Sequence, residues 1–182
     1  MNKKFLPLVA LSMLSIGFIA TSCDDDDEET TWERYTDWRN DNNAWIAEKA
    51  ALLDANGNHV FTAYQPRYSA TQFLMRFVND TTETSGNLQP YFTSTATVNY
   101  SVYLYNGTRI DSAANYTSEL SSSSLIGGWS EIITRMHVGD SVEAILPYVL
   151  GYGASGATSV YPYSALRFNI RLTDVPAYEV RP

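Results

Sequence analysis

The chain has 182 residues, of which 45% are hydrophobic, a size that suits one folded domain with a modest extension rather than a multidomain protein. Its formal net charge of −8, from 12 basic and 20 acidic residues, excludes the basic surface that nucleic acids require and makes attraction to an anionic membrane surface unfavourable. A single cysteine excludes a disulfide within the chain.

Residues 1–22 are typical of an export signal. Lys3 and Lys4 precede the apolar stretch FLPLVALSMLSIGFIA, which is too short for a membrane-spanning helix. The letters ATSC that follow resemble the lipobox of bacterial lipoproteins, which implies cleavage before Cys23 and acylation of that cysteine. An ordinary secretory peptide with an incidental cysteine is the alternative. We therefore expect an outer-membrane lipoprotein in the cell envelope of a Gram-negative bacterium, bound to the lipid membrane through Cys23.

An acidic run, DDDDEE, occupies residues 24–29 directly behind the cysteine. Six like charges in a row stay solvated and do not pack, so residues 23–31 are expected to form an acidic tether. Some Gram-negative lipoproteins resemble this arrangement and use it as a surface-export signal. The tether and the export signal remain two interpretations of the same residues, and the second would place the protein on the cell surface.

Residues 32–54 are predicted to form a helix, because apolar residues recur at seven-residue spacing. ANGN at 55–58 then ends the helix, which gives a helical extension over residues 32–58. The stripe predicts a docking face against the rest of the protein, with a dimer seam as the alternative, because a helix this short is weak alone. The stripe consists of Trp38, Trp45 and Leu52, widened by Ile46 and Leu53.

From residue 59 onward the chain is rich in strand patterns. We expect strands in HVFTAY, TQFLMRFV, FTSTATVNYSVYLYNGTRI, DSVEAILPYV and ALRFNIRL, with Asn106-Gly107 as a hairpin turn. TTETSGNLQP and SELSSSS are polar, and LIGGWSEIITRM is predicted to hold one short helix that begins near Trp129. One short helix among antiparallel strands predicts an α+β domain over residues 59–182.

The letters GYGASG at 151–156 match G-x-G-x-x-G, the spacing of a dinucleotide-binding turn. Such a turn must be followed by a helix, whereas ALRFNIRL alternates apolar and polar residues as a strand does. We therefore predict a surface loop that glycine makes possible, with Tyr152 displayed between two glycines.

Residues for acid–base, nucleophilic or metal chemistry are sparse. His59 and His137 lack metal-ligand spacing, no G-x-S-x-G motif is present, and Glu119, Glu131 and Glu143 form no recognisable pair. We expect no metal and no cofactor. The C-terminal half is instead aromatic, which suits a reaction whose barrier is only a bond rotation. These aromatic residues are Tyr100, Trp129, Tyr152, Tyr161, Tyr163 and Phe168.

Three stretches together resemble the FKBP family of peptidyl-prolyl cis-trans isomerases: VNYSVYLYNGTRIDSA, LIGGWSEIITRMHVGDSVEAILP, and GYGASG with YPYSALRFNIRLTDV. The resemblance covers about residues 71–175. It implies an antiparallel half-barrel sheet wrapped around one short helix, with the substrate pocket between them. It also implies an isomerase that acts on proline-containing polypeptides and binds macrolides such as FK506 and rapamycin.

The same resemblance assigns roles to individual residues. Trp129 would form the pocket floor, and the N–H of Ile126 and the hydroxyl of Tyr152 would hold substrate carbonyl groups. Asp111 would lie at the pocket edge among aromatic hydroxyls. Apolar walls would come from Leu125, Tyr100, Ile110, Val160 and Phe168.

The chain departs from the family pattern at several positions. Ile110 replaces a Phe before the Asp, Tyr161-Pro162 replaces a double Pro, and Val102 and Ile132 replace glycines. No counterpart is found for the aromatic residue that the family places between DSA and LIGGW. We expect these changes to preserve the fold and to weaken macrolide binding. Two other functions fit the same residues, namely a catalytically weak module that binds Pro-containing peptides and a surface lipoprotein with an unrelated ligand such as a glycan.

Overall fold

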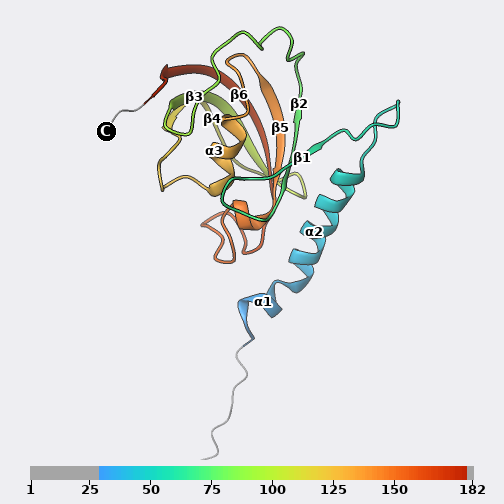
Figure 1. The fold of residues 1–182 in the computed structure, drawn as a ribbon. Helices are drawn as coiled ribbons and strands as arrows, with labels where there is room; N and C mark the ends of the chain where they lie inside the picture. The colour runs from blue at the N-terminus through green and yellow to red at the C-terminus, as the bar shows by residue number, and fades with distance from the viewer. Residues whose placement is uncertain (1–28, 180–182) are drawn as a thin grey trace, which may run out of the picture.

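The computed structural model describes residues 29–179, which form a six-stranded antiparallel sheet curved around a short helix (Figure 1). The strand order is β1-β2-β5-β6-β3-β4. This arrangement confirms the expected α+β class and the half-barrel form. In chain order the elements are α1 (Thr31–Arg34), α2 (Thr36–Ala51), β1 (Thr62–Tyr64), β2 (Phe73–Phe77), β3 (Thr95–Leu104), β4 (Arg109–Glu119), α3 (Gly127–Ile133), β5 (Ser141–Leu146), the 3-10 turn η1 (Tyr148–Leu150) and β6 (Leu166–Ala177).

The core lies between the concave face of the sheet and α3. Alternate residues of β6 from Leu166 to Leu172 are buried, as the period of two in ALRFNIRL predicts, and Val142, Ala144 and Leu146 of β5 are buried with them. They meet the buried face of α3, where Ile132 and Ile133 are fully enclosed. The helix is short, yet it is held because almost every residue in it is buried.

The β3–β4 hairpin turns at Asn106-Gly107, as predicted, with Gly107 at a φ of 86°. Strand β4 continues to Glu119, well beyond the strand pattern that ended at Ile110. This extension was missed because β4 is an edge strand whose side chains are mostly exposed, so it needs no apolar alternation. An irregularity interrupts the β3–β4 register between Val98 and Tyr100, opposite Asn115.

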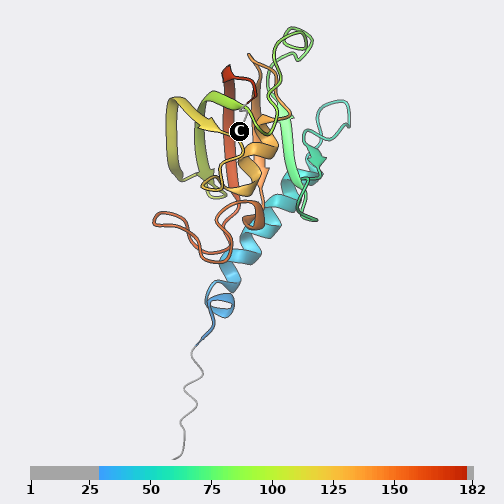
Figure 2. The ribbon, with the colours of Figure 1, turned by 60° about the vertical axis from the view of Figure 1, so that its left-hand side comes forward.

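Helix α2 lies against the convex face of the sheet, on the side opposite α3 (Figure 2). Trp45 and Ile46 pack on a small apolar cluster that comprises Phe61, Leu74 and Ile145. Leu52 and Leu53 were expected to extend this stripe, but both are exposed. The helix ends at Ala51 and Leu52 is extended, so the seven-residue period does not continue past that point.

None of the helices within residues 29–179 is long and apolar enough to cross a bilayer. The expected signal peptide, the acylated Cys23 and nearly all of the acidic run lie outside the described residues. The division between a helical extension and a domain that starts at residue 59 stays a prediction.

Asp140 is a fully buried carboxylate that ties the turn before β5 to the loop after β2. It accepts hydrogen bonds from the His137 N–H at 2.7 Å, from Asn79 Nδ2 at 3.1 Å and from the Thr84 hydroxyl. Burial alone would raise the pKa of Asp140, but the three hydrogen bonds outweigh burial and hold the pKa below its usual value.

We expect Asp140→Asn to lower the free energy of unfolding at neutral pH by about 1–3 kcal/mol, because an amide cannot accept all three hydrogen bonds. A carboxylate whose folded-state pKa is depressed stabilises the fold above its unfolded pKa, and that stabilisation is lost as the pH falls through the folded pKa. The difference between the variant and the parent should therefore shrink below about pH 4. Urea unfolding at pH 7 and pH 3 measures this stability difference, with Glu83→Gln, at an exposed position, as control. If the parent and Asp140→Asn have equal urea midpoints at both pH values, the role given to Asp140 is wrong.

Candidate active site

A small pocket of about 160 Å³ lies between the sheet and the start of α3. Its lining comes from β3, β4, α3, β6 and two loops, so residues far apart in the sequence meet there. Seven residues to which the family resemblance assigned a site role line this pocket. The lining comprises Tyr100, Val102, Asp111, Tyr116, Ser124, Leu125, Ile126, Trp129, Tyr152 and Phe168.

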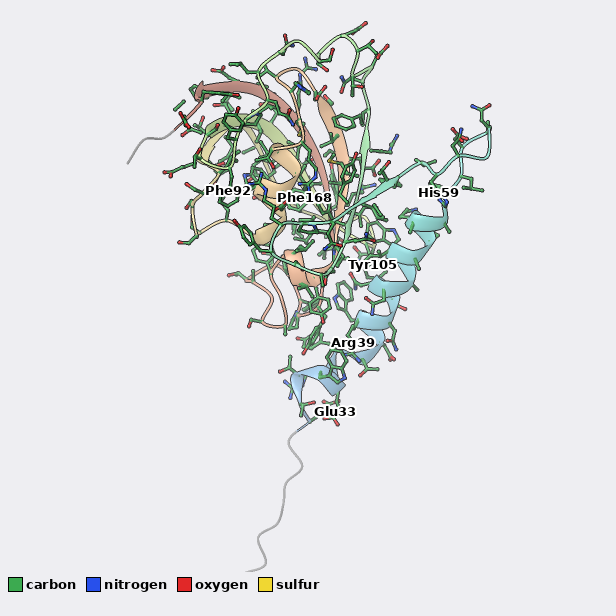
Figure 3. All side chains as sticks on the ribbon, viewed as in Figure 1. Glu33, Arg39, His59, Phe92, Tyr105 and Phe168 are labelled. Carbon is green, nitrogen blue, oxygen red and sulfur yellow. The ribbon has the colours of Figure 1, made fainter. Side chains whose placement is uncertain are left out.

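Trp129 is the buried aromatic centre of the pocket, with 4% of its surface exposed. Its ring makes edge contacts with Tyr100 at 5.1 Å and with Phe168 at 5.9 Å between centroids. The indole Nε1 donates to Ser118 Oγ at 3.2 Å, which fixes the ring plane. Phe168 of β6 is buried in the core (Figure 3). The two aromatic residues therefore give the pocket a rigid apolar base.

Gly128 allows α3 to approach the sheet this closely. A Cβ atom built on Gly128 would lie 2.3 Å from Leu146 Cδ1, and Leu146 is fully buried. Gly127 is different, because a Cβ there would lie 3.9 Å from the nearest atom, the Leu150 carbonyl oxygen. Of the two glycines before Trp129, only Gly128 is required by the packing.

Tyr116 is an aromatic pocket residue that the sequence analysis missed, and Ser124 also lines the pocket without having been expected there. Its ring lies 5.5 Å from Tyr100 and 5.9 Å from Trp129, both as edge contacts. It is placed by the irregularity in β4, where Asn115 has a φ of 54° and its N–H donates to Asn99 Oδ1 at 2.8 Å. Tyr116 is the aromatic residue that lines the pocket from the stretch between DSA and LIGGW. The Asn before it was the available signal, since Asn tolerates a left-handed backbone.

Asp111 and Tyr100 form a polar pair at the rim. The Tyr100 hydroxyl donates to Asp111 Oδ2 at 2.6 Å, and the other carboxylate oxygen accepts the Ser112 N–H at 2.8 Å. Burial, and then the hydrogen bond and the negative charge of Asp111, strongly raise the pKa of Tyr100. The tyrosine therefore stays protonated and the carboxylate is held in one orientation.

Tyr152 reaches the pocket from the glycine-rich loop, and 40% of its surface is exposed. Burial, and then the charge of Asp111, raise its pKa, so its hydroxyl stays a donor at neutral pH. Gly153 and Gly156 have φ values of 66° and 67°, which L-residues rarely adopt. A Cβ on Gly156 would also lie 2.3 Å from the Val160 carbonyl oxygen. The loop is thus a tight surface turn that displays a tyrosine, as predicted, and β6 rather than a helix follows it.

Leu125 and Ile126 form the wall where α3 begins. Ile126 is the N-cap of α3, with an extended φ of −65° and ψ of 147°. Its N–H makes no hydrogen bond with any residue in the described range 29–179, whereas the Leu125 N–H donates to the Ser122 carbonyl. The free N–H of Ile126 is therefore available to a ligand carbonyl group.

Two expected pocket residues do not line the pocket. Val160 is buried in the core, and the side chain of Ile110 is half-buried and packs against the same core. Tyr161 and Tyr163 lie against α1 and α2 instead. The histidines and glutamates have partners outside the aromatic pocket. His59 Nδ1 lies beside the Ala50 carbonyl, His137 contacts Asp140, Glu119 accepts from Ser121, Glu131 pairs with Arg135 and Glu143 pairs with Arg76.

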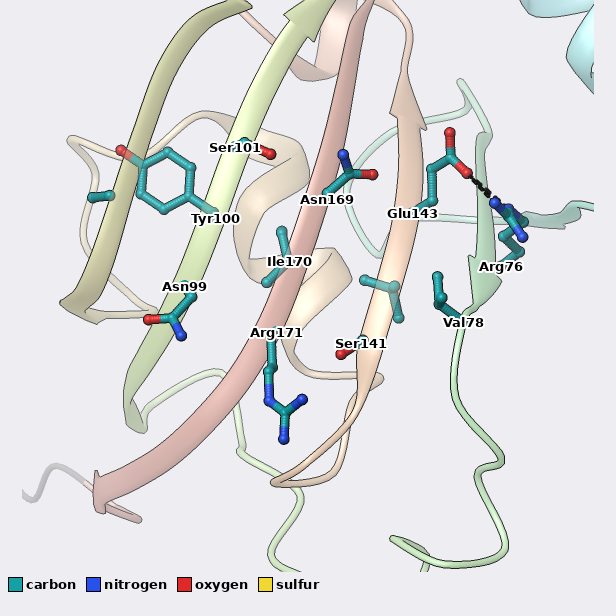
Figure 4. A pocket seen from close by; sticks show the side chains of 12 residues that line it. Arg76, Val78, Asn99, Tyr100, Ser101, Ser141, Glu143, Asn169, Ile170 and Arg171 are labelled. Carbon is teal, nitrogen blue, oxygen red and sulfur yellow. Dashed lines mark hydrogen bonds and ion pairs between the residues drawn. The ribbon is translucent and has the colours of Figure 1, made fainter.

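A larger hollow of about 480 Å³ lies on the convex face of the sheet (Figure 4). It is lined mainly by polar side chains, and Arg76 and Glu143 form an ion pair at 2.6 Å on its margin. Helix α3 lies behind the sheet in this view, and the hollow shares only Tyr100 with the aromatic pocket. The smaller pocket has the convergent aromatic side chains and is the candidate active site.

Comparison with protein families places residues 86–173 in FKBP-type peptidyl-prolyl cis-trans isomerase. FK506-binding protein 1 of Dictyostelium discoideum is 35% identical over 95 residues, which cover 50% of this chain and 88% of that protein. The FK506-binding protein of Neisseria meningitidis is 36% identical over 84 residues, covering 43% of this chain and 77% of that protein. The FKBP-type 22 kDa isomerase of Escherichia coli is 36% identical over 89 residues, 47% of this chain. This chain spans only 43% of that longer relative.

Two solved structures share the fold. An isomerase from Pseudomonas syringae aligns with a TM-score of 0.63 at 21% identity, covering 78% of this chain and 95% of that one. FkpA from Escherichia coli also gives a TM-score of 0.63, at 22% identity, over 80% of this chain and 64% of that one. Together with the sequence relatives and the half-barrel that encloses an aromatic pocket, these similarities lead to one conclusion: the chain belongs to the FKBP-type peptidyl-prolyl cis-trans isomerase family.

Proposed function

We propose that this protein is an envelope-anchored peptidyl-prolyl isomerase that assists the folding of exported polypeptides. The observation that carries the proposal is the pocket itself, where the buried Trp129 is ringed by Tyr100, Tyr116 and Phe168. Family membership supports the reaction, and the export-signal pattern of residues 1–22 supports the location.

Rotation about an X-Pro bond must cross a barrier of about 18–20 kcal/mol, which arises from the loss of amide resonance. Resonance places negative charge on the carbonyl oxygen, where water stabilises it. An apolar pocket that replaces this water favours the twisted, less polar amide. A shape that fits the twisted state better than either planar state lowers the barrier without transferring a proton.

Polar groups at the rim would orient the substrate above this apolar base. The free N–H of Ile126 and the hydroxyl of Tyr152 are donors to substrate carbonyl groups. Asp111 holds the Tyr100 hydroxyl in place and adds a fixed negative charge at the pocket edge. No covalent intermediate, metal or cofactor is required for this mechanism.

The soluble domain from residue 31 should accelerate cis-trans isomerisation of an Xaa-Pro peptide. Tyr152→Phe should lower kcat/KM by about twofold to tenfold, which corresponds to one net hydrogen bond of about 0.5–1.5 kcal/mol. Asp111→Ala should lower turnover without unfolding the domain, because Asp111 is on the exposed rim. Tyr161→Phe, an exposed tyrosine away from the pocket, is the control. If the parent shows no acceleration yet binds Pro-containing peptides, the protein is a binding module instead.

FK506 or rapamycin should bind the same pocket, because such macrolides mimic a twisted X-Pro amide. Binding should be weaker than is usual for the family, since the side chain of Ile110 does not reach the pocket and Tyr116 has a polar hydroxyl. Calorimetry with the parent and with Tyr152→Phe measures this. Equal affinity of the two proteins would place the macrolide elsewhere.

Cys23→Ala should release the protein from the membrane fraction, because acylation of Cys23 is the proposed anchor. Cell fractionation and blotting measure the release, and a variant that remains in the membrane fraction would contradict lipidation. Deletion of residues 24–29 separates the two interpretations of the acidic run. Loss of surface exposure with retained acylation identifies an export signal, and unchanged exposure identifies a tether.

A further inference from the structure

The loop that carries Tyr152 is fastened at its far end to α1 and α2. We call residues 151–165 the Tyr152 loop. Asn42 of α2 is almost fully buried, and its Oδ1 accepts the N–H of Ala165 at 2.7 Å. The same amide group donates to the Trp38 carbonyl at 2.7 Å, which fixes its orientation. One buried amide side chain therefore links the helix backbone to the point where the loop enters β6.

Trp38 adds a second attachment, one turn earlier in α2. Its indole Nε1 donates to Ser164 Oγ at 3.0 Å, and that hydroxyl donates to the Tyr161 carbonyl at 2.6 Å. The Trp38 ring also contacts the Tyr161 ring edge-on at 5.3 Å and the Tyr105 ring at 5.0 Å. The backbone of the loop and one of its aromatic side chains are thus both held by the same residue.

A third attachment centres on Tyr163, which is buried and has a positive φ of 62°. Trp32 meets its ring edge-on at 5.3 Å. The guanidinium of the buried Arg39 lies 3.3 Å above the Trp32 ring and 5.5 Å from the Tyr163 ring. Figure 3 shows Arg39 and Tyr105 at the end of the domain where α2 meets it. A bulky residue persists in this backbone conformation only where its surroundings hold it there.

Tyr163 connects these attachments to the active site. Its N–H donates to the Gly153 carbonyl at 3.0 Å, and Gly153 directly follows Tyr152. The Gly153 N–H in turn donates to the Tyr148 carbonyl at 2.9 Å. A shift of Tyr163 would therefore change the position of the backbone that carries the Tyr152 ring into the pocket.

We propose that Trp32, Trp38, Arg39 and Asn42 form a brace that positions Tyr152 for the isomerase reaction. The brace residues precede residues 86–173, the part of the chain that matches the family. They therefore lie outside the matched region and position a residue of the active site within it. The catalytic consequence rests on the proposed function. The mechanical part, an ordered Tyr152 loop, does not.

Asn42→Ala and Trp38→Phe test the brace, and the second keeps an aromatic ring, although a smaller one, while it removes the N–H that donates to Ser164. Each should lower kcat/KM, by no more than the roughly twofold to tenfold loss expected of Tyr152→Phe, because the displacement acts through the position of the Tyr152 hydroxyl. The loss should fall on the same parameter, kcat or KM, that Tyr152→Phe changes. Trp45→Ala is the matched control, because Trp45 is a half-buried tryptophan on the same helix that packs on Phe61, Leu74 and Ile145 instead.

A double-mutant cycle distinguishes positioning from general destabilisation. The effect of Asn42→Ala should shrink in a Tyr152→Phe background, whereas Trp45→Ala should leave kcat/KM unchanged in both backgrounds while lowering the Tm. Equal losses with and without the Tyr152 hydroxyl, or an equal loss from Trp45→Ala, would overturn the brace. If Asn42→Ala does not fold, Trp38→Phe decides the matter by the same criteria.

Hydrogen exchange of the amides at 152–157 provides a readout that needs no activity. Asn42→Ala or Trp38→Phe should accelerate exchange in this segment, and Trp45→Ala should not. If the parent lacks isomerase activity but exchange responds as expected, the proposed function fails and the mechanical part of the brace stands. Unchanged exchange in both brace variants overturns the proposal, whatever the parent's activity.

Discussion

Trp129→Ala should abolish measurable macrolide binding and lower the free energy of unfolding by about 3–5 kcal/mol, the usual cost of removing a buried aromatic residue. The ring is the shared contact of Tyr100, Tyr116 and Phe168, so its removal leaves three aromatic side chains facing a cavity. Isomerisation should fall with binding, because the base that excludes water is lost. Chemical denaturation and calorimetry measure the two effects separately.

Trp129→Phe separates the ring from its N–H. Phenylalanine keeps an apolar base but cannot donate to Ser118 Oγ, so binding should weaken less than in Trp129→Ala. Full macrolide affinity in a folded Trp129→Ala protein would show that the pocket is not the binding site. The active site would then have to be assigned to another hollow.

Gly128→Ala should destabilise the protein by about 1–3 kcal/mol, the typical cost of overpacking a core. The new methyl group would lie 2.3 Å from Leu146 Cδ1 and 3.0 Å from Leu146 Cγ. Leu146 is fully buried in the core, so we expect the new methyl group to push α3 away from the sheet. That movement displaces Trp129, the next residue, and isomerase activity should fall together with stability.

Gly127→Ala is the matched control, one residue away in the same helix. Its methyl group would make only an ordinary contact, 3.9 Å from the Leu150 carbonyl oxygen. Alanine also favours a helix over glycine by up to about 1 kcal/mol, so this variant should be neutral or slightly more stable. Thermal unfolding of the two variants measures the difference. Equal melting temperatures would mean that α3 is not held as tightly as its contacts indicate.

The sequence predicted the core strands and helix well, because their buried residues recur at a regular spacing. The alternation in β6 and the glycine at position 128 each reflect one packing face, and a single sequence records such patterns directly. The resemblance to the FKBP family, carried by the order and spacing of the motifs, then implied the half-barrel. Four of the six residues that were expected to be catalytic and that line the pocket come from its strands and helix, Ile126 is the N-cap of that helix, and Tyr152 comes from a loop.

The misses occur where exposure or a backbone irregularity decides the structure. Tyr116 lies on an exposed edge strand without a hydrophobic period, and its direction depends on the left-handed backbone at Asn115. Ile110 and Val160 occupy expected positions in the pattern, yet their side chains turn to the core. The stripe on α2 predicted a docking face, but not that the buried polar residues Arg39 and Asn42 would lie at its centre.

The irregular register of β4 also bears on how the protein behaves among its own copies. The sheet is open, so β4 presents an outer edge with backbone groups that another strand could extend. The register shifts near Asn115 and near Tyr103 break this edge into short lengths, and the opposite edge, β1, has only three residues. Neither edge offers a long straight template for strand addition. In the proposed role beside unfolded polypeptides, such edges would guard the protein against joining their aggregates.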